Sequence, residues 1–136
     1  MARLLHLLLF FFFATLAVGC VTARDVVSAH DRGDGTVRVV PAPLGETWNA
    51  THAALAANHA RQIEEHFDDN FMIANAEVSQ WSYGARMGVW LEQLPGDRTL
   101  VRAVVLQKGP APFGQNEEML LDDIESAVAD IEQRSR

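Results

Sequence analysis

The chain has 136 residues, with 11 Lys and Arg against 18 Asp and Glu, and its formal net charge is −7 at neutral pH. This length suits one domain with a modest core. Nucleic-acid binding and electrostatic attachment to anionic lipid both need clustered basic residues, so the acidic composition argues against both functions.

Residues 1–19 have the three parts of a secretory signal. Arg3 gives a positively charged start, an apolar run extends from Leu4 to Val18, and small residues follow. The run is shorter than the roughly 20 residues that a transmembrane helix needs. We therefore expect residues 1–19 to be a signal peptide that is removed from the mature protein.

The segment LAVGC, which ends at Cys20, resembles the lipobox of bacterial lipoproteins. In that family, small residues precede a cysteine that is lipidated and becomes the mature N-terminus. Cys20 is the only cysteine of the chain, so an intramolecular disulfide is excluded and lipidation accounts for the lone thiol. The resemblance implies a membrane attachment through lipid on Cys20, with the protein facing the periplasm.

The residues after Cys20 bear on which membrane holds the protein and on where the signal peptide is cleaved. Val21 stands where lipoproteins retained in the inner membrane often have aspartate, which favours the outer membrane. Two alternatives to a lipid anchor remain. The first is ordinary secretion with cleavage after Ala23, since small residues also precede that position. The second is an uncleaved anchor.

The mature chain divides into two parts by composition. Residues 20–35 lack a sustained hydrophobic period and are expected to form the lipidated N-terminus and a flexible tether. Residues 36–136 are expected to form a single domain. The alternation in Thr36 to Val40 predicts its first strand, and the spacing of Leu44, Trp48 and Leu55 predicts an amphipathic helix after it.

The centre of the domain is predicted to be a sheet. Residues 61–67 fit a helix or a strand, and residues 71–78 fit a strand. Residues 85–94 and 99–108 flank a Pro-Gly-Asp-Arg turn and predict a hairpin. Pairing Leu94 with Thr99 places Met87 and Val89 on the core face and Arg102 near its rim.

A second helix, capped by Asn116, closes the chain. The expected fold is therefore α+β, with an antiparallel four- to five-stranded sheet and two helices packed on one face. The order of its elements is β-α-β-β-β-β-α.

Three segments resemble a family of small bacterial envelope lipoproteins of unknown function. They are ETWNA at 46–50, SYGARMGVW at 82–90 and the turn GDRT at 96–99. The resemblance implies a helix-grip-like domain and a strand over residues 61–67. Similar domains in lipoprotein subunits of the outer-membrane β-barrel assembly machinery mediate protein contacts. Some helix-grip relatives hold apolar ligands between helix and sheet.

No catalytic or cofactor motif occurs in the sequence, so we expect neither catalysis nor a cofactor. His52, His59 and His66 recur every seven residues, but on one helix successive members would lie about 10.5 Å apart, too far to share a metal ion. The acidic residues between 64 and 69 lack the glycine and alternating oxygens of a calcium loop. We expect no metal site.

The segment around Trp81, Tyr83 and Arg86 is the candidate interaction site. Two large aromatic residues beside a glycine form either a lid on the core or an exposed anchor, and Trp, Tyr and Arg are enriched at the centres of protein interfaces.

The leading hypothesis is a non-enzymatic envelope lipoprotein that acts through protein contacts as an accessory factor. The alternative is a carrier or sensor of a small apolar ligand, which predicts a closed apolar cavity lined by Trp48, Leu55 and the hairpin. A hydrolase is the third hypothesis.

Overall fold

Five antiparallel strands form one sheet, and helices lie on both of its faces. The computed structural model describes residues 21–79, 82–107 and 116–135. In space the strand order is β1-β5-β4-β3-β2. The elements are α2 (Ala23–Asp31), β1 (Thr36–Val40), α3 (Leu44–Ala57), β2 (Ala60–His66), β3 (Phe71–Ser79), β4 (Ser82–Leu94), β5 (Arg98–Gln107) and α4 (Glu117–Arg134).

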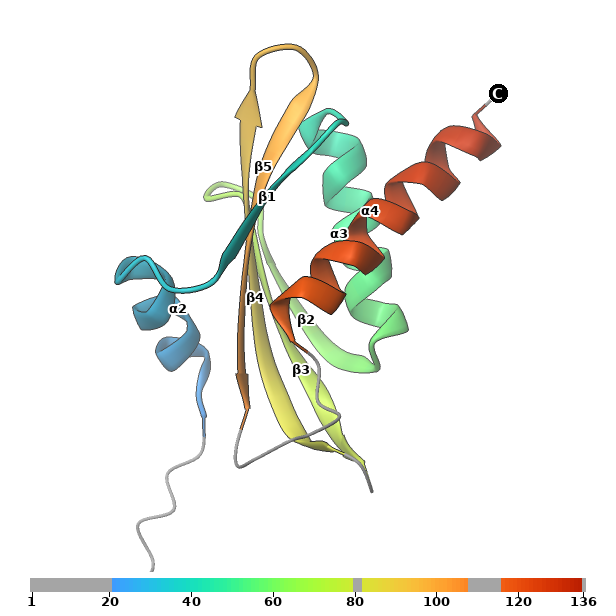
Figure 1. Ribbon diagram of the computed structural model, residues 1–136. Coiled ribbons are helices and arrows are strands. Elements are labelled where there is room, and N and C mark those ends of the chain that lie inside the picture. The colour runs from blue at the N-terminus through green and yellow to red at the C-terminus, as the bar shows by residue number, and fades with distance from the viewer. Residues whose placement is uncertain (1–20, 80–81, 108–115, 136) are drawn as a thin grey trace, which may run out of the picture.

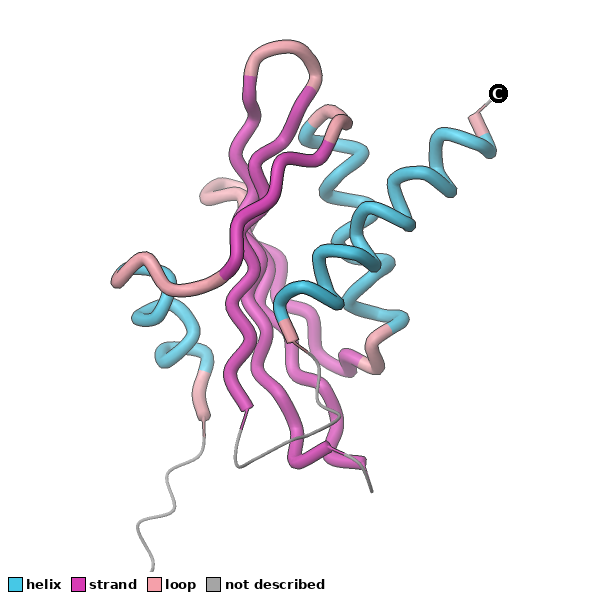
Figure 2. Tube along the Cα trace, in the orientation of Figure 1, coloured by secondary structure: helices cyan, strands magenta, loops and turns pink. Residues whose placement is uncertain are grey.

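Helices α3 and α4 cover one face of the sheet, which we call the inner face, and α2 lies on the opposite, outer face (Figures 1 and 2). From residue 36 onward the order is β-α-β-β-β-β-α, so the expected α+β fold with two helices on one face is confirmed. Helix α2 is an addition to it.

The core lies between the inner face and the two long helices. It is built from alternate residues of the strands and from one stripe of each helix, because side chains alternate across a strand and recur every three or four residues on a helix. Its fully buried large side chains include Leu55, Met72, Met87, Leu120 and Ile124.

Residues 60–66 are a strand, β2, which confirms the prediction drawn from the family resemblance. Helix α3 ends before it for a local reason. The Asn58 side chain donates hydrogen bonds to the Ala54 carbonyl and to Asp123 of α4, both at 2.8 Å. His59 then adopts a positive φ of 59°, which interrupts the helix and turns the chain into β2.

The predicted register of the β4–β5 hairpin was wrong by one residue. Leu94 pairs with Arg98 and not with Thr99, because the turn contains three residues, of which Gly96 and Asp97 have positive φ. A shift of one residue exchanges the two faces of a strand. Val101 and Ala103 are therefore in the core, and Arg102 lies opposite Trp90 on the outer face.

The expected flexible tether over residues 20–35 is also corrected, because Ala23–Asp31 forms helix α2. Thr22 and Asp25 form a reciprocal capping box at its start. Val26 and Ala29 have no exposed surface and pack against Val104 of β5. The folded part of the chain thus includes residues that composition assigned to a linker.

Candidate functional site

The sequence-predicted site residues are only partly within the described chain. Cys20 and Trp81 lie outside the described residues. Tyr83 belongs to β4, where it pairs with Val78 of β3. Arg86 is half-buried, on the outer face of the same strand. Because Trp81 lies outside the described residues, whether the three predicted contact residues form one site stays a prediction.

A row of stacked rings crosses the outer face instead. Strand pairing places Phe71 of β3 beside Trp90 of β4 and His66 of β2 beside Phe71. The ring centroids of Phe71 and Trp90 are 5.6 Å apart, and those of His66 and Phe71 are 4.2 Å apart. His30 at the end of α2 stacks on the other side of Trp90, at 4.0 Å and an interplanar angle of 12°. The row joins α2 to three strands.

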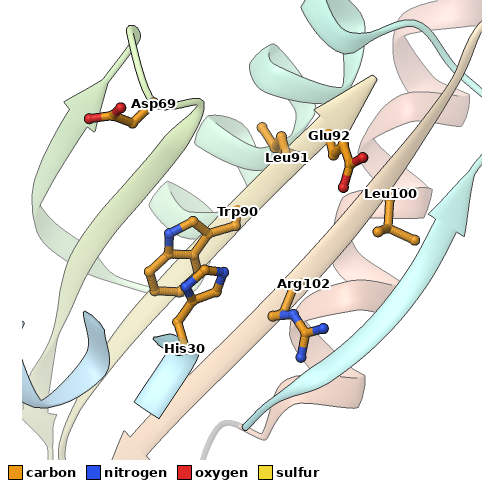
Figure 3. Close-up of a pocket in the computed structure, with 7 residues that line it drawn as sticks. All are labelled: His30, Asp69, Trp90, Leu91, Glu92, Leu100 and Arg102. Carbon is orange, nitrogen blue, oxygen red and sulfur yellow. The ribbon is translucent and has the colours of Figure 1, made fainter. Parts of the chain in front are cut away.

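A pocket of about 310 Å³ opens beside Trp90, between the end of α2 and the sheet (Figure 3). It is lined by His30, Asp69, Trp90, Leu91, Glu92, Leu100 and Arg102. The lining therefore combines an aromatic wall and two leucines with one guanidinium and two carboxylates. It includes no serine, threonine or cysteine that could act as a nucleophile.

Arg102 fixes the rim of this pocket. Its Nη1 donates hydrogen bonds to the carbonyl oxygens of Gly33, at 3.0 Å, and Asp34, at 3.3 Å. These residues belong to the loop between α2 and β1, so one side chain of β5 holds that loop over the sheet. Charged donors make the stronger class of hydrogen bond. The pocket is thus a place where α2 and its loop are fastened to the domain.

The space between α3 and the hairpin is filled by side chains. Leu55, Met87 and Val89 have no surface accessible to a water-sized probe, so no ligand-sized cavity borders them. Trp48 is half-buried and stacks on Phe67, with ring centroids 4.8 Å apart. Leu55, Met87 and Val89 therefore do not border the closed cavity that the ligand-carrier hypothesis placed at Trp48, Leu55 and the hairpin.

The three histidines that recur every seven residues lie in three different parts of the fold. His52 is exposed on α3, His59 is in the turn after it, and His66 is on β2. Among the residues that the structure describes, no group of three or more His, Cys, Asp or Glu is placed to hold a metal ion. No helix in the same ranges is long and apolar enough to cross a membrane.

Sequence reasoning missed His30 and Arg102 as parts of a surface site. The sequence signal that could have found His30 was the capping box of α2, the helix that carries it. Thr22 followed by Asp25 three residues later marks a helix start. Arg102 was missed because a one-residue error in register moved it to the inner face.

No family model matches the chain, and no curated protein matches it. Among solved structures, the di-domain aromatase/cyclase StfQ of the steffimycin biosynthetic pathway superposes with a TM-score of 0.49 at 14% identity, over 75% of this chain and 46% of that one. The chain thus spans about half the length of StfQ.

Two further structures are similar at a lower level. A START superfamily protein from Mycobacterium smegmatis gives a TM-score of 0.45 at 11% identity, over 72% of this chain and 97% of that chain. A conserved protein from Geobacillus kaustophilus gives a TM-score of 0.38 at 10% identity, over 69% of this chain and 93% of that chain. At TM-scores below 0.5, what these proteins bind or catalyse is not transferred to this chain.

Proposed function

We propose that this protein is a bacterial envelope lipoprotein, anchored by lipid on Cys20, that acts as a non-enzymatic accessory factor through contacts with an envelope protein. The apolar segment before Cys20 and the absence of any other cysteine support the anchor. The two or more acyl chains that stable anchoring requires are the modification that a lipobox specifies.

The observation that carries the proposal is the position of α2 relative to the two cleavage sites. The helix begins at Ala23, and its capping residue Thr22 accepts a hydrogen bond from the Asp25 amide while its own amide donates to the Asp25 carboxylate. Processing at Cys20 leaves this capping box complete. Cleavage after Ala23 would remove Thr22, a loss of about 1 kcal/mol of helix stability. The fold therefore favours a mature chain that starts at Cys20.

Reciprocal variants of the two cleavage sites test the proposal in a bacterial host, with membrane fractionation as the readout. Cys20→Ala is expected to abolish mature membrane-bound protein, because it removes the lipid acceptor. Ala23→Leu blocks only the alternative site and is expected to leave processing and membrane residence unchanged. If Ala23→Leu stops processing while Cys20→Ala is cleaved and released, the lipid anchor is wrong.

A second candidate function is favoured by the outer-face pocket. There the protein would carry or sense a small ligand with an apolar ring, held between α2 and the sheet against Trp90. The dye anilinonaphthalene sulfonate is a suitable probe of this pocket. Trp90→Ala is expected to weaken its binding about tenfold, whereas Trp48→Ala, on the other side of the sheet, is expected to leave it unchanged. Equal binding by both variants would contradict this second function.

A further inference from the structure

The two edges of the sheet differ in how they are protected. Among the described residues, no strand pairs with the outer edge of β1 or of β2. Four of the seven residues of β2 are ionisable, including Glu64 and Glu65. Charges of this kind prevent an edge strand from pairing with other chains. In β1, with the sequence TVRVV, only Arg38 is charged.

Arg38 is already held within the fold and does not protect the edge. Its guanidinium donates hydrogen bonds to three carboxylates of α4, those of Glu118, Asp122 (2.5 Å) and Glu125 (2.9 Å). The hydrogen bond to Asp122 is the main cause that raises the pKa of Arg38 above its ordinary value. Three carboxylates face one guanidinium, so the inner side of this edge has an excess of negative charge.

The outer side of the same edge is apolar. Val37 is 41% exposed and Val39 is 43% exposed, although both are β-branched residues of a type that is usually buried. Among the side chains whose burial the structure describes, only two other large apolar ones are exposed, and one of them, Met119, follows Glu118 in the first turn of α4. The edge strand thus has an apolar side and an acidic side.

We propose that the free edge of β1 binds an extended segment of a partner protein, which adds to the sheet as a sixth strand. Main-chain hydrogen bonds to β1 would hold the segment, and alternate side chains would give specificity. Its apolar residues would lie beside Val37 and Val39, and its basic residues would face the carboxylates around Arg38. The inference rests on the proposed function, because it names the surface through which the protein contacts are made.

The charge around β1 favours a segment of a different protein over a second copy of the chain. Pairing β1 with β1 of another copy would bring two acidic surfaces together, and like charges across strands are destabilising. A basic and apolar segment of a different protein meets no such repulsion.

Peptide binding tests the proposal, with fluorescence polarisation of a labelled octapeptide of alternating lysine and valine as the probe. The full-length chain is expressed in bacteria and purified in detergent, so that processing and lipid are left as they are. We expect the lysine–valine peptide to bind about tenfold more tightly than its glutamate–valine counterpart. Methylation of its backbone nitrogens on one edge is expected to weaken binding by a similar factor, because it removes the main-chain donors.

A matched pair of double variants locates the site. Val37→Lys with Val39→Lys is expected to weaken binding of the lysine–valine peptide about tenfold. Ala53→Lys with Ala56→Lys adds the same charge on the exposed face of α3 and is expected to leave binding unchanged. Bound peptide should also slow amide hydrogen exchange over residues 36–40 in the unsubstituted chain, which supplies a readout that does not depend on the variants folding.

Three results would overturn the proposal. They are equal binding of the lysine and glutamate peptides, unchanged exchange over residues 36–40, and a dimer that the Val37 and Val39 substitutions dissociate. Peptide binding by the Cys20→Ala variant tests strand addition at β1 independently of the lipid anchor. Peptide binding is expected to survive that substitution, and a wild-type chain that binds the peptide but is soluble would contradict only the anchor.

Discussion

At the scale of single residues, Gly88 determines how closely α2 approaches the sheet. A Cβ atom at this position would lie 2.5 Å from Cγ1 of Val26 and 2.6 Å from two ring atoms of Trp90. The Trp90 ring is itself confined, because it stacks on His30 and packs against Phe71. Glycine is therefore required here by close packing and not by backbone conformation.

Substitution of two glycines tests this packing. Gly88→Ala is expected to lower the free energy of unfolding by about 1–3 kcal/mol, the usual cost of overpacking. Gly45→Ala is the matched control, because a Cβ atom there has no neighbour within 4 Å, and it is expected to raise the free energy of unfolding by about 0.5–1 kcal/mol. Urea denaturation measures both. Equal stability of the two variants would contradict the close approach of α2.

Asp25 makes the stability of α2 dependent on pH. Its hydrogen bonds to the Thr22 backbone and side chain lower the pKa of the carboxyl below its ordinary value of 3.8. A group with a lowered pKa in the folded state adds stability above its unfolded pKa and loses it as the pH falls through the folded value. The protection factors of the amides in α2, which correct exchange rates for their intrinsic pH dependence, should therefore fall below about pH 3.8, and Asp25→Asn should remove this acid-dependent component. Wild-type protection factors that do not change with pH would contradict the capping box.

At the scale of elements, the sequence predicted the helices and strands that have a clear hydrophobic periodicity. Strand β1 was predicted with its observed bounds, and α4 was predicted with its observed cap at Asn116, because strand alternation and a capping residue are strong signals. Helix α2 was missed because only Val26 and Ala29 face the sheet, which is too few for a period. The hairpin register was missed because composition does not distinguish a two-residue turn from a three-residue turn.

The same limits apply to the surface site. Alternation along β4 puts Trp90 on the face opposite Met87 and Val89, and the structure has it there. Its partners His30 and Arg102 come from a helix and a register that sequence did not resolve, so the pocket could not be predicted.

Loss of the capping residue tests whether α2 behaves as a separate local element. Thr22→Ala is expected to destabilise α2 by about 1 kcal/mol and so to accelerate amide exchange within it roughly fivefold. Ser28→Ala, at an exposed position of the same helix, is the control and should change little. Exchange in β4 is expected to be unaffected by either substitution. Equal acceleration throughout the sheet would show that α2 is part of the global unfolding unit.

At the scale of the whole molecule, a folded α2 changes how an anchored protein would stand at the membrane. Cys20 and Thr22 are separated by at most about 7 Å of extended chain, so lipid on Cys20 would hold the domain against the bilayer. Helix α2 begins near the end of the sheet where β4 starts, and the β4–β5 turn stands at the opposite end (Figure 1). The exposed residue Asp97 belongs to the β4–β5 turn at that opposite end, away from anionic lipid.

Fluorescent labels measure this orientation in vesicles that contain quenchers on the lipid headgroups. A label on Arg24→Cys is expected to be strongly quenched, and a label on Asp97→Cys weakly. Insertion of twenty glycine and serine residues after Val21 is expected to equalise the two, because a long flexible linker lets the domain leave the surface. Equal quenching without the insertion would contradict a domain held close to the membrane.

Whether the mature chain begins at a lipidated Cys20 is decided by the intact mass of the protein extracted from bacterial membranes. We expect a chain of residues 20–136 that carries the added mass of the lipid, with the capping box of α2 complete. An unmodified chain that begins at Arg24 would contradict a lipidated start at Cys20, because cleavage would then have removed Thr22 and the start of α2.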